Sequence, residues 1–155
     1  MFEYHCDPEV VRYVHFGTVN SVDDTRKVIE SILSEIGGDG KGWYFAIALK
    51  ENDKLIGTLD VHTVMPQHRR CEFGWMMTRA YWGHGYMTEA VRKMIRFCFE
   101  EMGMHRIEAS IDEGNERSER LAERLGMQRE GMLRENERSK GRFVSNTIYS
   151  ILHNG

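Results

Sequence analysis

The sequence predicts an α/β (α+β) fold in which helices cover the faces of a mixed sheet. Strand, loop, helix, strand and helix patterns follow one another between residues 70 and 126, as in strands joined by helical crossovers. Hairpin patterns at 43–64 and 127–152 add antiparallel strands on either side of this region. With 155 residues the chain is long enough to bury its own core, so we expect a single domain over residues 1–155.

Two helices are predicted before residue 40. In "DPEVVRYV", Asp7 suits a helix N-cap and Pro8 suits the first helical position, so a short helix is expected through about Val14. The next stretch, "SVDDTRKVIESILSEIGGDG", predicts an amphipathic helix that ends at Gly37 and Gly38. Its apolar residues at helical spacing are Val28, Ile29, Ile32, Leu33 and Ile36.

The hydrophobic period changes from helix to strand at Trp43. "WYFAIALK" and "LIGTLDVHTV" flank the turn residues "ENDK", which predicts a β-hairpin from Trp43 to Val64. A turn at Pro66 leads into "RRCEFGWMM", which predicts a further strand that ends near Met77.

The second half of the chain predicts a long helix, a strand, a short helix and a closing hairpin. "MTEAVRKMIRFCFEEMGM" is the long helix, ending near Gly103, and "HRIEASID" is the strand that follows. "GNERSERLAERLGM" is a short helix ended by Gly126, and the tail forms two or three strands with "SKGR" as the hairpin turn. The buried face of the long helix is expected to comprise Met87, Ala90, Val91, Met94, Ile95, Cys98 and Met102.

Composition argues against several kinds of partner. The formal net charge is −3 and basic residues are scattered among acidic ones, so nucleic-acid binding is not expected. Apolar runs are far shorter than the roughly 20 residues that cross a bilayer, and the N-terminus lacks a signal-peptide pattern, so we expect a cytoplasmic protein without membrane contact. Cys6, Cys71 and Cys98 are widely spaced and odd in number, which favours reduced thiols packed as small apolar side chains.

The stretch "YWGHGYMTEA" places Gly83 and Gly85 directly before the long helix. Unpaired N–H groups and the helix dipole favour an anion there, although an isolated Gly-x-Gly is more often an ordinary turn. Thr88 stands where a dinucleotide-binding motif needs its third glycine, and no Gly-Lys-Ser/Thr completes a P-loop. The loop therefore favours a diphosphate bound mainly by backbone N–H groups, with His84 and Arg92 as side-chain candidates.

Four segments occur in the order and spacing of one family: "CEFGWMM", "YWGHGYMTEA", "NERSERLAERLGMQREGMLRE" and "SKGRFVSNTIYSIL". Together they resemble the GCN5-related N-acetyltransferase (GNAT) family, and in particular its RimJ/RimL type of ribosomal-protein N-terminal acetyltransferases. The coenzyme A loop of that family has the pattern Gln/Arg-x-x-Gly-x-Gly/Ala. Residues 82–87 occupy these positions, with Trp82 and Met87 departing from the pattern at its two ends.

The resemblance implies the GNAT fold, a mostly antiparallel sheet with a central parallel strand pair, flanked by helices. The RimJ/RimL branch begins with a strand ahead of the segment "DPEVVRYV", whereas this chain has only six residues there. We therefore expect the first strand to be missing, which leaves a sheet edge exposed or open to another subunit. A monomer and a homodimer are both consistent with the sequence.

The resemblance also implies an acetyl-CoA-dependent N-acetyltransferase. Backbone N–H groups from Gly83 to Thr88 would hold the diphosphate, and the pantetheine would run beside the end of the preceding strand. The N–H of Met77 or its neighbour would bind the thioester carbonyl. Turn, core and helix-cap roles are the simpler alternatives for the same residues. The residues implied in acetyl-CoA binding are Met76, Met77, Thr78, Trp82, Gly83, His84, Gly85, Tyr86, Met87, Thr88, Asn115 and Ser118.

Three residues are candidates for acid–base catalysis, since an acceptor amine must lose a proton and a leaving thiolate can gain one. Glu72 and Glu137 are the candidate bases, acting directly or through water. Glu72 lies in an apolar strand, whereas Glu137 lies in a charged stretch that is also typical of a solvated surface. By resemblance Ser118 is the candidate acid, because Ala122 stands where many relatives have a tyrosine, although acetyl transfer without a side-chain acid is also open.

No metal site is expected, because His62, His68, Cys71 and His84 match no compact ligand spacing. A cysteine nucleophile is not expected either, so direct transfer without an acyl-enzyme is favoured. The rival hypothesis is a non-catalytic acyl-CoA-binding or sensing module. The acceptor has no recognisable sequence code: the resemblance points to a protein N-terminus, such as that of a ribosomal protein, and small-molecule amines stay open.

Overall fold

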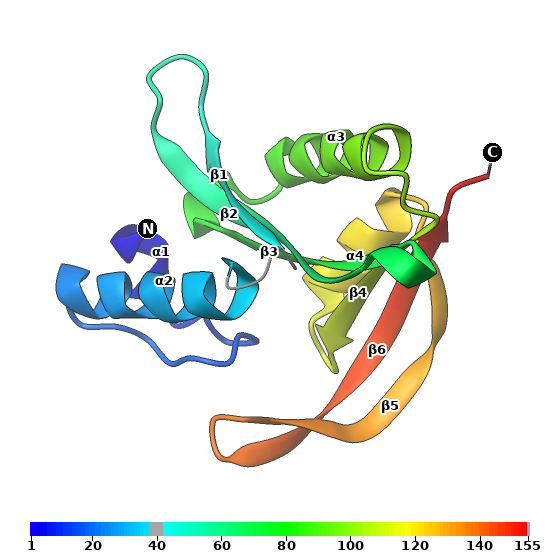
Figure 1. Cartoon of the computed structure of the whole chain (residues 1–155). Helices are drawn as coiled ribbons and strands as arrows, with labels where there is room; N and C mark the ends of the chain where they lie inside the picture. The colour runs from blue at the N-terminus through cyan, green and yellow to red at the C-terminus, as the bar shows by residue number, and fades with distance from the viewer. Residues whose placement is uncertain (38–41, 155) are drawn as a thin grey trace.

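The computed structural model describes residues 1–37 and 42–154, which form a six-stranded sheet flanked by helices (Figure 1). The strand order is β1-β2-β3-β4-β6-β5, and neighbouring strands are antiparallel except for β3 and β4, which are parallel. The predicted mixed sheet with a central parallel pair is confirmed. The strands are β1 (Trp43–Ala48), β2 (Leu55–Met65), β3 (Arg70–Met77), β4 (Arg106–Asp112), β5 (Gln128–Ser139) and β6 (Arg142–Leu152).

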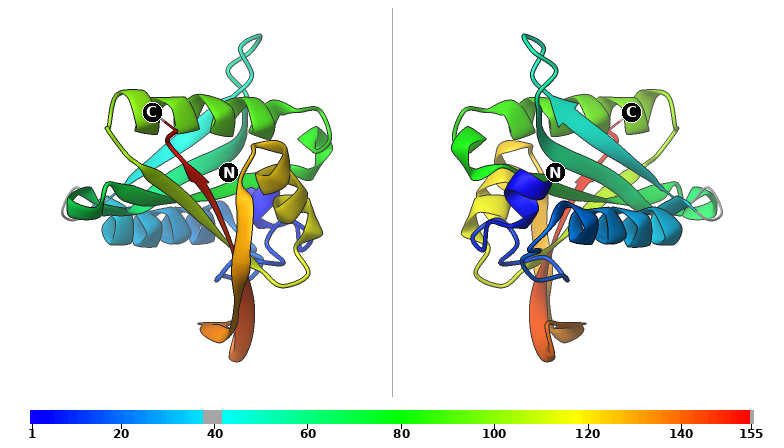
Figure 2. Two further views of the ribbon diagram at one scale, coloured as in Figure 1. Left: turned by 90° about the vertical axis from the view of Figure 1, so that its right-hand side faces the viewer. Right: turned by 90° about the vertical axis from the view of Figure 1, so that its left-hand side faces the viewer.

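Helices lie on both faces of the sheet. α3 and α4 cover one face, and α2 lies on the opposite face with α1 beside it (Figure 1 and Figure 2). No helix within the described residues is long and apolar enough to cross a membrane. The helices are α1 (Phe2–His5), α2 (Val22–Gly37), α3 (Tyr86–Glu100) and α4 (Glu116–Arg124), with short 3₁₀ turns η1 (Pro66–His68) and η2 (Arg79–Tyr81).

The hydrophobic core fills the space between the sheet and the layer of α3 and α4. Alternate residues of β2, β3 and β4 point into it, because side chains alternate between the two faces of a strand. Val91, Ile95 and Cys98 of α3 meet them at helical spacing, as predicted. Cys71 and Cys98 are buried free thiols, whereas Cys6 is exposed, which corrects the expectation that all three cysteines are buried.

The helix predicted over residues 8–14 is wrong, and the first helix is α1. Asp7 does cap a turn, because its side chain accepts a hydrogen bond from the backbone N–H two residues later (3.0 Å). The turn does not continue as a helix. The N–H groups of Val10 and Val11 both donate to the Asp7 carbonyl, and the carbonyls of Val11 and Arg12 accept from the Lys140 ammonium at 2.6 and 3.1 Å. The segment is therefore a series of turns that a tertiary contact ties to the closing hairpin.

The two predicted hairpins are confirmed as β1–β2 and β5–β6. The turn of the second hairpin consists of Lys140 and Gly141, both at positive φ, as two-residue hairpins require. α2 extends to Gly37, and Gly38 of the predicted helix end lies outside the described residues. Wherever the structure describes the chain ahead of β1, it is helical or in turns, so β1 is an edge strand of the sheet.

His5 is a buried histidine that links folding to pH. Its ring is fully buried between Tyr4 and Phe16, and neither ring nitrogen has a hydrogen-bond partner among the described residues. Burial, assisted by the nearby N-terminal ammonium, lowers the pKa of His5 from 6.5 to about 4. Between these values the unfolded chain binds the proton and the folded protein does not, so stability is lost as the pH falls from 6.5 toward 4.

Replacing His5 by phenylalanine should therefore flatten the pH dependence of stability in this interval. Phenylalanine fills a similar space without a titrating group, and it needs no hydrogen-bond partner. Urea unfolding at pH 7 and pH 4.5 measures the effect, with the exposed His68→Phe as the control that should follow the wild type. Equal losses of stability in His5→Phe and wild type would contradict the prediction.

Candidate active site

β3 and β4 are paired at one end and separate at the other. Their parallel pairing covers Arg70, Cys71 and Glu72, and beyond Glu72 no further pair joins them. An ion pair joins the strands at the paired end, where Arg70 Nη1 of β3 lies 3.2 Å from the Glu108 carboxylate of β4, which Arg106 of the same strand also binds at 2.5 Å. The two strands therefore form a V with Glu72 at its vertex.

The edge of β3 that faces this V presents backbone N–H groups. The N–H of Thr78 donates to the Ile56 carbonyl of β2 at 2.8 Å, which establishes the direction of the N–H groups along β3. Because this direction alternates along a strand, the N–H groups of Trp75 and Met77 point away from β2 and toward the opening. A carbonyl oxygen that gains negative charge in the opening would be stabilised by such donors.

The loop before α3 has the geometry of an anion site. Gly83 and Gly85 have φ values of 80° and 86°, a left-handed conformation that glycine adopts without steric cost. The first helical hydrogen bond runs from the Glu89 N–H to the Gly85 carbonyl (2.9 Å), and no described side chain caps the helix. The N–H groups of residues 86–88 thus precede the first helical bond, at the positive end of α3, where a phosphate is stabilised.

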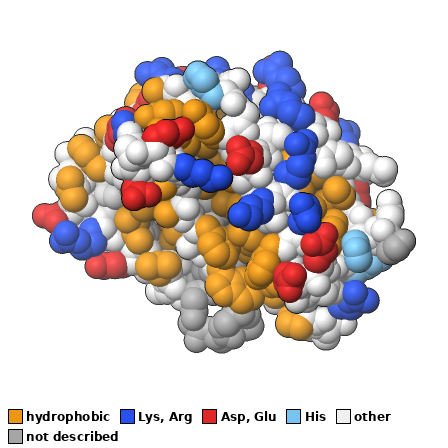
Figure 3. Space-filling model, turned by 90° about the horizontal axis from the view of Figure 1, so that it is seen from above, with side chains coloured by type: hydrophobic (Ala, Val, Ile, Leu, Met, Phe, Trp, Pro, Cys, Tyr) orange, Lys and Arg blue, Asp and Glu red, His pale blue; other side chains and the backbone are white. Residues whose placement is uncertain are grey.

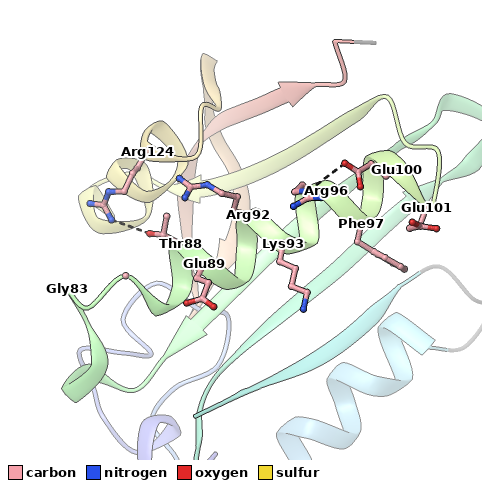
Figure 4. Close-up of a pocket in the computed structure, with 11 residues that line it drawn as sticks. Gly83, Thr88, Glu89, Arg92, Lys93, Arg96, Phe97, Glu100, Glu101 and Arg124 are labelled. Carbon is pink, nitrogen blue, oxygen red and sulfur yellow. Dashed lines mark hydrogen bonds and ion pairs between the residues drawn. The ribbon is translucent and has the colours of Figure 1, made fainter. Parts of the chain in front are cut away.

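A groove of about 860 Å³ continues from this loop along α3 (Figure 4); we call it the basic groove, because its basic residues outnumber the glutamates Glu89, Glu100 and Glu101 that also line it. Arg92, Lys93 and Arg96 project from the helix, and Arg124 of α4 reaches toward its first turn, with Nη1 3.3 Å from Thr88 Oγ1. Viewed from above α3, lysine and arginine side chains gather on this side of the molecule (Figure 3). Phosphate groups are the ligands that such a surface attracts.

The V, the glycine loop and the segment after α1 border one cleft of about 1440 Å³. It brings together most of the site residues predicted from the sequence. Thr78 and His84 are outside its lining: Thr78 is buried at the strand end, and His84 is exposed and stacks on Tyr86. The predicted residues that line the cleft are Glu72, Met76, Met77, Trp82, Gly83, Gly85, Tyr86, Met87, Thr88, Asn115, Ser118 and Glu137.

The start of α4 positions Ser118 in the cleft. Asn115 is the N-cap, as predicted, and its side-chain oxygen accepts from the Ser118 N–H at 3.4 Å. The Ser118 hydroxyl oxygen accepts from the Trp75 Nε1–H of β3 at 3.1 Å. Because this bond uses a lone pair of the oxygen, the hydroxyl hydrogen can still be donated to a group in the cleft.

The two predicted bases lie on different walls of the cleft. The Glu72 side chain is at the vertex of the V and 23% exposed, with Oε1 3.7 Å from His62 Nε2. The Glu137 side chain comes from β5, is 37% exposed, and lies 4.0 Å from His15 Nε2. Of these two carboxylates, Glu72 is the one on β3, the strand whose Trp75 and Met77 N–H groups face the opening.

Asp60 and His62 of β2 adjoin Glu72. His62 Nδ1 lies 2.6 Å from Asp60 Oδ2, while Nε2 faces Glu72. Burial alone would lower the pKa of His62, but the contacts with Asp60 and Glu72 outweigh it and raise this pKa to about 10. His62 is therefore an imidazolium at neutral pH. No group of three or more His, Cys, Asp or Glu residues in the described parts of the chain has an arrangement that could hold a metal ion.

The family of the chain follows from comparison with known proteins. Residues 1–128 match the family model described as "Acetyltransferase (GNAT) domain", which covers most of the sequence. The chain belongs to the GNAT acetyltransferase family. It is 34% identical over 150 residues to p20, an uncharacterized N-acetyltransferase of Bacillus licheniformis, and the match covers 97% of this chain and 84% of p20.

A solved structure and a further relative agree with this GNAT assignment. The crystal structure of a GNAT-family acetyltransferase from Bacillus anthracis matches with a TM-score of 0.84 and 28% identity, over 100% of this chain and 88% of that chain. The [ribosomal protein uS5]-alanine N-acetyltransferase of Escherichia coli is 29% identical over 101 residues, which is 64% of this chain and 52% of the relative. The GNAT fold and the resemblance to the ribosomal-protein acetyltransferases are thus confirmed.

Several residues of the GNAT cleft were not predicted as site residues. Asp60 and His62 are two residues apart in a predicted strand and so share one face, which made their proximity predictable. The contact of His62 with Glu72 depends on the pairing of two strands. Arg117 was not predicted either: its guanidinium lies 4.2 Å from the ring centre of Trp82, a predicted site residue whose Nε1–H donates to the Met77 carbonyl at 2.8 Å. No local pattern signals the contact between Arg117 and Trp82.

Proposed function

We propose that this GNAT protein transfers the acetyl group of acetyl-CoA directly to a primary amine while both substrates are bound. The observation that carries the proposal is the V between β3 and β4. Around it lie a carboxylate (Glu72), a backbone donor (Met77 N–H) and a hydroxyl that can donate (Ser118). Direct transfer needs a base, a donor for the carbonyl oxygen and an acid for the sulfur, and these groups supply one of each.

The phosphates of acetyl-CoA would bind at the start of α3. The N–H groups of residues 86–88 and the two left-handed glycines would hold the diphosphate, and the basic groove along α3 would attract the remaining negative charge. From this end the pantetheine can follow β3 into the V, past Met76 and Met77, to reach Ser118. The donor therefore occupies the side of the cleft next to α3 and α4.

The chemistry follows from the groups along the V. Glu72 accepts a proton from the acceptor ammonium, so that the nitrogen lone pair can attack the thioester carbonyl. The Met77 N–H stabilises charge on the carbonyl oxygen. Ser118 gives a proton to the sulfur as the C–S bond breaks, and the attacking nitrogen, once bonded to carbon, loses its second proton to water. Water reprotonates Ser118, and Glu72 releases its proton to solvent. The products are the N-acetylated amine and coenzyme A.

The acceptor is proposed to be a cationic primary amine, either a protein N-terminus or a small molecule. Two observations support this class. One relative is named for acetylation of an alanine of ribosomal protein uS5. In addition, carboxylates that suit an ammonium group line the cleft, beside the arginines Arg12, Arg117, Arg120 and Arg124. These carboxylates are Glu9, Asp60, Glu72, Asp112, Glu116 and Glu137.

Turnover with a panel of amines tests the proposal. Coenzyme A release is followed with a thiol reagent at pH 8 for peptides with different N-termini, spermidine and lysine. Initial rates should give intersecting double-reciprocal lines, as expected when both substrates bind before transfer. Tight binding of acetyl-CoA without turnover on any amine would favour the acyl-CoA-binding module, and no binding at millimolar acetyl-CoA would overturn both hypotheses.

Ser118→Ala should lower kcat about 10²-fold, because the departing sulfur loses its proton donor. The KM for acetyl-CoA should change less than about twofold, since backbone groups carry most of the proposed phosphate binding. Ser34→Ala, at an exposed position of α2, is the control and should match the wild type. A wild-type kcat in Ser118→Ala would show that the thiolate leaves without a side-chain acid.

A further inference from the structure

A charged histidine lies beside the proposed base at the vertex of the V. His62 and Glu72 are cross-strand partners on β2 and β3, with Nε2 and Oε1 3.7 Å apart. The other ring nitrogen of His62, Nδ1, lies 2.6 Å from Asp60 Oδ2. One imidazole thus bridges two carboxylates from neighbouring strands, and all three side chains are less than one-third exposed.

Gly74 provides the space that the Asp60 carboxylate occupies. Asp60 and Gly74 are cross-strand partners. A Cβ atom at residue 74 would lie 2.6 and 2.7 Å from the two carboxylate oxygens of Asp60, which is closer than side chains pack. Because β3 has no side chain at this position, the carboxylate can lie flat against the strand and receive the Nδ1–H of His62.

A β-bulge next to His62 interrupts the pairing of β2 and β3. The register shifts between His62 and Met65, and Thr63 has a φ of 49°. This left-handed conformation is unusual for a β-branched residue and persists only where the surrounding structure enforces it. Bulges change the direction of neighbouring side chains. The residue that follows His62 therefore has an unusual backbone conformation that the surrounding structure enforces.

We propose that His62, held as an imidazolium by Asp60, is a positioning residue that draws the Glu72 carboxylate to the vertex and presents it to the acceptor amine. The role of Glu72 as base rests on the proposed function, whereas the charged arrangement of the three side chains does not. Two carboxylates and one imidazolium leave one net negative charge, which still attracts the acceptor ammonium. His62 itself already carries its proton, so it does not act as the base.

The charged groups that face His62 are Asp60 on its own strand and Glu72 on β3, and Tyr44 of β1 is the cross-strand partner of Asp60. Burial lowers the pKa of His62, and the two carboxylates more than reverse this and raise it to about 10. The imidazolium therefore persists over the neutral and mildly alkaline range. Removing the Asp60 charge should shift the titration of His62 downward by about one to three pH units.

Ring-nitrogen NMR of the ¹⁵N-histidine-labelled protein tests the charge of His62 without substrate. The His62 signals are assigned by their loss in His62→Gln. In wild type both ring nitrogens should be protonated at pH 8, with a midpoint near 10, and Asp60→Asn should lower the midpoint. A wild-type ring that is neutral at pH 8 would overturn the inference, and this result needs no activity measurement.

Kinetics test the positioning role. His62→Gln should lower kcat about 10- to 100-fold through misplacement of Glu72, with less than about a twofold change in the KM for acetyl-CoA. The exposed His68→Gln is the matched control and should change neither value. A wild-type kcat in folded His62→Gln would overturn the positioning role of His62 and leave the proposed function intact. A wild-type kcat in Glu72→Gln would overturn both the proposed base and its positioning, so the two failures can be distinguished.

Discussion

Glu72→Gln is expected to lower kcat for acetyl transfer about 10³-fold, because glutamine keeps the shape of the side chain but cannot accept a proton. Glu72 is at the vertex of the V, where the pairing of β3 with β4 ends and from which β3 continues to the Trp75 and Met77 N–H donors. Without the base, only acceptor molecules that are already neutral can react. The residual rate of Glu72→Gln should therefore rise about tenfold per pH unit until the acceptor amine itself titrates.

Two further variants test whether the loss of kcat is specific to the Glu72 carboxylate. Glu137→Gln removes the carboxylate on the β5 wall of the same cleft, and its kcat should fall much less than that of Glu72→Gln. Glu51→Gln, at an exposed position between β1 and β2, controls for the loss of one surface charge. A larger loss of kcat in Glu137→Gln than in Glu72→Gln would assign the base to β5 instead.

Gly57→Ala is expected to destabilise the protein by about 3 kcal/mol, because the strand pairing leaves no space for a methyl group. Gly57 of β2 is the cross-strand partner of Met77. A Cβ atom at residue 57 would lie 2.5 Å from the Met76 carbonyl oxygen and 3.1 Å from the Met77 Cα. Both are backbone atoms, so no side-chain rotation relieves the contact, and β2 must shift against β3.

Urea unfolding at pH 7 measures this effect, with Gly131→Ala as the matched control. Gly131 is also in a strand, β5, and a Cβ atom there would meet nothing within 4 Å. Its replacement should change the free energy of unfolding by less than about 0.5 kcal/mol. Gly57→Ala should also weaken acetyl-CoA binding, since the shift disturbs the pairing of β2 with the end of β3 that carries the Met77 N–H. Equal unfolding midpoints for the two variants would contradict the prediction.

The elements with a strong local pattern were predictable. The 43–64 hairpin, the long helix α3 and the closing hairpin all follow from periodicity and turn residues, and the structure confirms them. The helix expected over residues 8–14 failed although Asp7 caps a turn as predicted. The segment forms turns instead, and Lys140, from the tip of the closing hairpin, donates to the carbonyls of Val11 and Arg12. A contact between residues so far apart in the sequence cannot be inferred from neighbouring residues.

Some features of the candidate site were also predictable from the sequence, and others were not. The left-handed glycines at 83 and 85 and the Asn115 cap belong to single loops and helix ends, so the sequence indicated them directly. Glu72 was readable as an unusual acid in an apolar strand, but its place at the vertex depends on where β3 and β4 stop pairing. The contact between His62 and Glu72 depends likewise on the register of β2 against β3.

The sequence by itself determined the periodic elements, the anion loop before α3 and the order of the family motifs, because each depends on residues that are close along the chain. Only the tertiary structure decided which side chains meet at the vertex of the V and that Lys140 holds the segment after Asp7. The physical reason is that strand pairing and long-range hydrogen bonds join residues that no local pattern connects.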